Sequence, residues 1–129
     1  MTGSAGYVPG VCNIGPAEIR RRRLSGRLGL GLTVVFLVVA FALAIPAPWR
    51  ALVALPAGLA AAGFLQAAFR FCAGFGIRGL FNFGDVGVEE EVHEAEFRRK
   101  DQRKAMLIGM LSFLIAALAA VVAVVMPFP

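Results

Sequence analysis

Acidic residues are few in this chain, and none lies in its three long apolar stretches. The 129 residues include eight Asp and Glu, one His, one Trp and one Tyr. Proton relays and ion pathways normally place ionisable groups inside the membrane. Because the apolar stretches contain no carboxylate, the sequence disfavours a self-contained pump or secondary transporter.

Cysteine and histidine are too sparse for a metal-binding framework. The chain has two cysteines and one histidine, whereas structural zinc sites need three or four clustered ligands. Glu90 and His93 match the carboxylate–histidine spacing of helical di-iron sites, but such sites need further ligands from other helices. We therefore expect no cofactor and a solvated charged face there, with Glu90 and His93 as weak metal candidates only.

Apolar residues, in contrast, make up 59% of the chain, and charged residues make up only 16%. A small soluble domain has too little interior to hide so much apolar surface. Three stretches, about 28–45, 52–72 and 105–126, are long enough to cross a bilayer as helices. The sequence predicts an all-α membrane protein with three transmembrane helices, in contact with the lipid bilayer.

The basic residues indicate an orientation. Five of the 13 Lys and Arg precede the first span, one lies between the first two spans, and seven lie between residues 70 and 104. Cytoplasmic segments carry an excess of Lys and Arg. We expect a multi-pass protein of the plasma membrane with a cytoplasmic N-terminal segment (1–27), a cytoplasmic loop (73–104) and an external tail (127–129). Since the positive charges flank apolar spans, nucleic-acid binding is disfavoured.

The third span follows a strongly charged segment, 88–104, with no helix breaker between them. Acidic residues come first and basic residues last, which suits the helix dipole. The sequence predicts one continuous helix over 88–126, about 58 Å long, that projects into the cytoplasm. Asp85 is a candidate for its N-terminal cap, and Pro16 marks the start of a short basic helix before the first span.

Small residues recur along the third span at steps of three and four. They are Gly109, Ser112, Ala116, Ala119 and Ala123. Such a stripe lets two helix backbones approach closely in lipid. It packs either on the other two spans or on another subunit, which is a second copy or a different membrane protein.

A few thiol and polar side chains are further candidates for function, and the two cysteines lie at the same membrane face. Cys12 and Cys72 form either a thiol pair with redox chemistry or a pair of small buried residues. Gln66, Arg70 and Arg78 are candidates for a polar pore or partner contact. The segments VCNIGPAEIRRRR and FCAGFGIRGLFNFG are distinctive, but they match no activity.

The leading functional hypothesis is a non-catalytic membrane subunit or scaffold. It would use its small-residue helix faces and its charged cytoplasmic helix to bind partners. One alternative is a homo-oligomeric pore or carrier for a small neutral or lipophilic molecule. The other is a membrane enzyme that uses the cysteines or a metal at Glu90 and His93.

Overall fold

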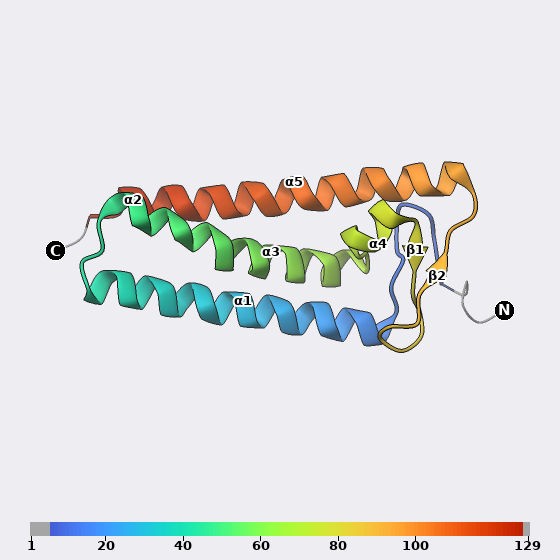
Figure 1. Ribbon diagram of the computed structural model, residues 1–129, viewed down its shortest axis with the longest axis horizontal. Helices are drawn as coiled ribbons and strands as arrows, with labels where there is room; N and C mark the ends of the chain where they lie inside the picture. The colour runs from blue at the N-terminus through green and yellow to red at the C-terminus, as the bar shows by residue number, and fades with distance from the viewer. Residues whose placement is uncertain (1–5, 128–129) are drawn as a thin grey trace.

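Three long apolar helices lie side by side in a flat layer (Figure 1). The computed structural model describes residues 6–127, so the first five residues of the N-terminal segment and the last two of the predicted tail lie outside it. The helical stretches Pro16–Ala42, Ala47–Phe69 and Ala95–Val125 are each long and apolar enough to cross a membrane. They confirm the predicted mostly helical class with three candidate spans.

The basic segment and the first span form one helix, α1, Pro16–Ala42. Gly15 precedes it in an extended conformation, Pro16 occupies its first turn, and Glu18 lies at its positively polarised end. The helix therefore starts at the predicted Pro16, and the basic segment continues into the first span without a break. The helix also ends three residues before the predicted boundary at residue 45, because Ala44 adopts a positive φ of 51°.

The second span is built from three consecutive pieces. They are α2 (Ala47–Arg50), the 3₁₀ turn η1 (Ala51–Val53) and α3 (Ala54–Phe69). The 3₁₀ turn comes just before Pro56, whose ring nitrogen cannot donate to the carbonyl of Leu52. Arg70 then ends α3 in the left-handed conformation, two residues before the predicted end of the span.

The third span and a charged segment share one helix, as predicted, but α5 begins at Ala95 rather than Val88. Residues 90–91 instead form β2 (Glu90–Glu91), which pairs antiparallel with β1 (Leu80–Phe81). Buried Val92 also donates to the carbonyl of Gly79. These pairings remove the acidic run from the helix, so α5 is about 46 Å long.

Asp85 does not cap α5, so the prediction that Asp85 is its N-terminal cap is wrong. The residue before α5 is Glu94, and no side chain caps it. The carbonyl of Asp85 accepts a hydrogen bond from the Asn82 side chain. Asp85 thus belongs to a turn in the loop after β1.

Helix α3 lies between α1 and α5 and packs against both (Figure 1). Glycines allow the closest approach, between α1 and α3. A Cβ atom added to Gly63 would lie 2.7 Å from the Cα of Gly26, and one added to Gly29 would lie 2.8 Å from the Cα of Ala60. Such contact between backbones is how helices associate in lipid.

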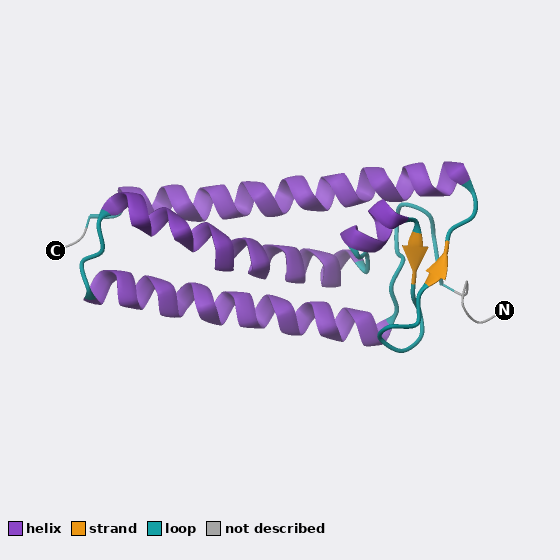
Figure 2. Ribbon diagram, in the orientation of Figure 1, coloured by secondary structure: helices purple, strands orange, loops and turns teal. Residues whose placement is uncertain are grey.

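The two ends of the layer differ. At one end, Nη1 of buried Arg50 donates to the carbonyls of Ala123 and Met126, both at 2.9 Å, and so caps the C-terminal end of α5. At the other end, the strands and loops form a folded structure (Figure 2). We call it the basic-end cap: residues 6–15, the short helix α4 (Ala73–Arg78), residues 79–94, and the first turns of α1 and α5.

Candidate functional site

Two buried asparagines connect the segments of the cap. The Asn13 side chain accepts from the backbone N–H of Cys72 at 2.7 Å and donates to its carbonyl at 3.2 Å. The Asn82 side chain donates to Glu18 at 3.1 Å and to the carbonyl of Asp85 at 2.7 Å. Their backbones also pair, since Asn82 N–H donates to the carbonyl of Asn13. The N-terminal segment is thereby fixed between α1, α4 and the loop after β1.

A charged pair supports this connection. Glu18 is 1% exposed, and its carboxylate lies 3.2 Å from the guanidinium of Arg22 one helical turn later. Another nitrogen of Arg22 lies 2.9 Å from the sulfur of Cys72, and the guanidinium lies over the ring of Phe75 at 5.8 Å. Glu18 and Arg22 therefore act as structural groups that tie α1 to α4.

Tyr7 and Asp101 fix the N-terminal segment to α5. The Tyr7 hydroxyl donates to the fully buried Asp101 carboxylate at 2.6 Å, and the N–H of Gly10 donates to its other oxygen at 2.8 Å. The Tyr7 ring stacks on Phe81 with a centroid distance of 4.7 Å. Burial, followed by the bond to Asp101 and the charge of that carboxylate, raises the pKa of Tyr7 above its ordinary value.

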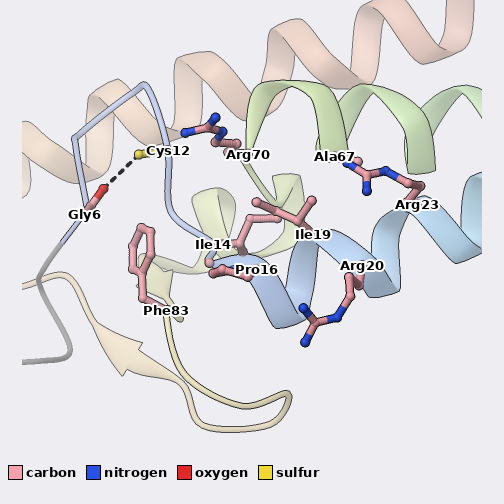
Figure 3. Close-up of a pocket in the computed structure, with 11 residues that line it drawn as sticks. Gly6, Cys12, Ile14, Pro16, Ile19, Arg20, Arg23, Ala67, Arg70 and Phe83 are labelled. Atoms are coloured by element: carbon pink, nitrogen blue, oxygen red, sulfur yellow. Dashed lines mark hydrogen bonds between the residues drawn. The ribbon is translucent and has the colours of Figure 1, made fainter.

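A cavity of about 660 Å³ opens between the N-terminal segment, the start of α1 and the end of α3 (Figure 3). Three arginines lie around it, and the side chains between them are mostly apolar. Its lining comprises Gly6, Cys12, Ile14, Gly15, Pro16, Ile19, Arg20, Arg23, Ala67, Arg70 and Phe83. A volume of this size is typical of small-molecule sites.

The three arginines, Arg20, Arg23 and Arg70, are exposed, and none makes an ion pair with another residue in the range 6–127. The nearest acidic group of α1, Glu18, already contacts Arg22 and Asn82. The cavity therefore carries uncompensated positive charge above an apolar floor. This arrangement can bind an anion, and among residues 6–127 the lining contains no nucleophile with an adjacent base.

The two cysteines do not form a disulfide. The thiol of Cys12, at the cavity, donates to the carbonyl of Gly6 at 2.9 Å. Cys72 is buried with Ile14 and Phe75 and lies beside Arg22. Each sulfur thus has its own polar neighbour.

The polar candidates near the membrane face have different surroundings. The Gln66 side chain donates to the carbonyl of Ala62 and accepts from the N–H of Ala73, so it connects α3 to the start of α4. Arg78 donates to the carbonyl of Gly74 and lies 5.6 Å above the Phe75 ring. Only Arg70 of these three lines the cavity.

Glu90 and His93 do not share a helix. Glu90 lies in β2, and both side chains are exposed. Across the described part of the chain, no group of three His, Cys, Asp or Glu side chains could hold a metal ion. The helical spacing that suggested a di-iron site is therefore absent.

The small-residue stripe divides between two faces of α5. Ala116 and Ala123 are buried, Ser112 and Ala119 are half-buried, and the Cβ of Ala116 lies within 3.5 Å of a Cβ added to Gly58 of α3. Gly109 instead is exposed, with open space where a side chain would stand. Around it, Met106, Met110, Phe113 and Leu114 form a groove of about 400 Å³.

Sequence reasoning missed the grouping of Arg20 and Arg23 with Arg70, and the roles of Asn13, Asn82 and Asp101. The asparagines lie within the two distinctive segments, which was the available signal. Their partners, however, are distant along the chain, and Asp101 lay in a run of charges that suggested a solvated face.

Comparison of the chain with protein-family models, curated proteins and solved structures gave no match.

Proposed function

We propose that the chain is a non-catalytic subunit of a membrane assembly, and that a helix of another subunit packs on the outer face of α5. The groove at Gly109 carries this proposal. Most of the small-residue stripe lies toward α3, whereas Gly109 leaves a notch on a face that no described helix covers. Flexible Met106 and Met110 beside it can adapt to a neighbouring helix.

The proposed orientation places the cap in the cytoplasm of a cell bounded by this membrane. Twelve of the 13 basic residues lie at the cap end or on the adjoining helix turns, and the remaining one, Arg50, caps α5 at the opposite end. With Cys12→Ser as the background of both variants, a Pro127→Cys protein should react with an impermeant thiol reagent in intact cells. Exposed Val88, changed as Val88→Cys, should react only after lysis. The reverse pattern would invert the orientation.

The alternatives receive less support from the arrangement of side chains. A pore lined by Gln66 is disfavoured because both ends of its amide are engaged within its own chain. Thiol chemistry is disfavoured at Cys72, which is 5% exposed. The partner-binding proposal uses a surface that remains open.

The test is Gly109→Leu, with Gly31→Leu as the matched control. Both glycines lie in the apolar part of a long helix, and an added Cβ would meet nothing within 4 Å at either position. Both changes raise helix propensity by about 1 kcal/mol, so the helices themselves should persist. The two variants differ in the helix surface that they alter, since Gly31 lies in α1 and Gly109 lies in α5.

The measurement is the mass of the complex extracted in a mild detergent. The wild-type chain of 13.6 kDa and the Gly31→Leu variant should both migrate in a larger assembly. Gly109→Leu should release the monomer. A wild-type protein that is strictly monomeric, or a Gly109→Leu variant that assembles normally, would contradict the proposal.

A further inference from the structure

We propose that the cavity between α1, α3 and the N-terminal segment binds the phosphate headgroup of an anionic membrane lipid. This inference rests on the arginines at the cavity and is independent of the α5 interface. It gives the basic-end cap a ligand and places that ligand at a defined site.

The depth of the cavity along the helices matches the headgroup layer. The uncharged part of α1 begins at Leu28, and Arg23 lies five residues earlier, about 7.5 Å along the helix axis. On α3, Arg70 directly follows the last helical residue of the apolar span. Headgroups occupy roughly 5–8 Å on each side of the hydrocarbon core. The backbones of Arg23 and Arg70 are therefore at the level of lipid phosphates, and Arg20 lies one helical turn farther out on α1.

The chemistry of the cavity fits a phosphate that is attached to an apolar chain. Guanidinium groups bind phosphate oxygens through paired N–H donors, and three of them are present without an acidic partner among residues 6–127. Ile14, Ile19 and Ala67 lie between them (Figure 3). A free phosphate would leave this apolar surface uncovered, whereas a lipid places its glycerol and first methylenes there.

The backbone of Arg70 supports the same conclusion. Its φ of 54° and ψ of 42° lie in the left-handed region, where glycine is the usual helix-ending residue. Arginine at such a position costs stability because its Cβ crowds the backbone. Its carbonyl meanwhile accepts from the N–H groups of Asn13 and Ile14, an interaction that any residue could make. Glycine would make the same backbone contacts without this cost, so what arginine adds at position 70 is its side chain. That side chain lies at the cavity.

This conformation permits a sharp test, because Arg70→Gly removes the charge and relieves the backbone at once. The variant should keep or raise the melting temperature of the cap while it weakens lipid binding. The full chain in detergent is titrated with phosphatidylglycerol or phosphatidylcholine, and bound lipid is counted by native mass spectrometry. Arg27→Gln is the control, since it removes an exposed arginine from α1 outside the cavity.

Wild-type protein should bind phosphatidylglycerol at least about ten-fold more tightly than phosphatidylcholine. Arg70→Gly should lose about five-fold in affinity, and the double variant Arg20→Gln with Arg70→Gly about 25-fold. Arg27→Gln should stay within about two-fold of wild type.

Three results would overturn the inference. They are equal binding of the two lipids, an equal loss in Arg27→Gln and Arg70→Gly, and displacement of phosphatidylglycerol by inorganic phosphate or glycerol phosphate at matching affinity. The last result would assign the cavity to a soluble phosphate ligand. Loss of assembly in Gly109→Leu with intact lipid binding would separate this inference from the proposed subunit role.

Discussion

Different interactions stabilise the two halves of the molecule, the layer of long helices and the basic-end cap. In the layer of α1, α3 and α5, glycine and alanine bring backbones together, as at Gly26 and Gly63. In the basic-end cap, side-chain amides and carboxylates bond to backbone groups of segments far apart in the sequence, as Asn13 bonds to Cys72 and Asp101 to Gly10.

The difference follows from the surroundings of each half. Between helices in lipid there is no hydrophobic driving force, so close van der Waals contact has to provide the association. The cap lies at the edge of the apolar region and contains irregular backbone whose N–H and C=O groups need partners. Buried asparagines supply those partners. The cap can therefore have a specific shape, which a surface for lipid or protein binding requires.

The substitution Asn82→Asp should change stability the most, and it tests whether buried asparagines hold the cap. The change keeps the shape of the side chain but replaces the donor to buried Glu18 with a second carboxylate. We expect the free energy of unfolding of the cap to fall by about 3 kcal/mol at neutral pH, and the loss to shrink in acid. The rate of limited proteolysis in the loop at 84–94, in detergent, measures this loss of cap stability.

Gln102→Glu serves as the control, because it makes the same amide-to-carboxylate change at an exposed position of α5. Its effect should remain within about 0.5 kcal/mol. If both variants resist proteolysis like wild type, the asparagine network does not hold the cap.

The same comparison explains what the sequence could predict. The three spans follow from runs of apolar residues, since a helix that satisfies its own backbone is the only local solution in lipid. The start of α5 at Ala95 did not follow, because residues 88–94 favour a helix locally and their pairing with β1 is a tertiary effect. The cap network was equally hidden, because Tyr7 and Asp101 are 94 residues apart and no periodic pattern connects them.

A smaller effect, in the layer, is expected from Gly63→Ala compared with Gly31→Ala. The added methyl group at Gly63 would lie 2.7 Å from both the Cα of Gly26 and the carbonyl oxygen of Arg22, so the helices must separate at a cost of about 2 kcal/mol. At Gly31 the same change meets open space and should stabilise α1 by up to about 1 kcal/mol. Thermal unfolding in one detergent compares the two.

Opposite signs for the two substitutions would confirm that backbone contact holds the layer. Equal stabilisation would instead show that α1 and α3 can repack without loss. In that case the layer would resemble a loose group of spans, and only the cap would define the shape of the molecule.

The smallest change in stability is expected at the contact between the N-terminal segment and α5. The ionisation of one side chain, Tyr7, reports on this contact. Tyr7 is the single tyrosine of the chain, so the ultraviolet absorbance of tyrosinate reports on this site alone. Burial and the Asp101 carboxylate raise its pKa above the ordinary value of 10.0. The phenol should therefore stay protonated in the folded protein at a pH where it is half-ionised in the unfolded chain.

The sign of the linked stability follows from that shift. Because the folded pKa is the higher one, the contribution of Tyr7 is complete below pH 10 and is lost as the pH rises toward the folded pKa. Tyr7→Phe, which keeps the ring stacked on Phe81 but removes the donor to Asp101, should lower stability by about 1.5 kcal/mol at neutral pH. The difference in stability between Tyr7→Phe and the wild-type protein should become smaller at alkaline pH. A folded wild-type protein whose tyrosine titrates near pH 10 would show that Tyr7 does not hold the N-terminal segment on α5.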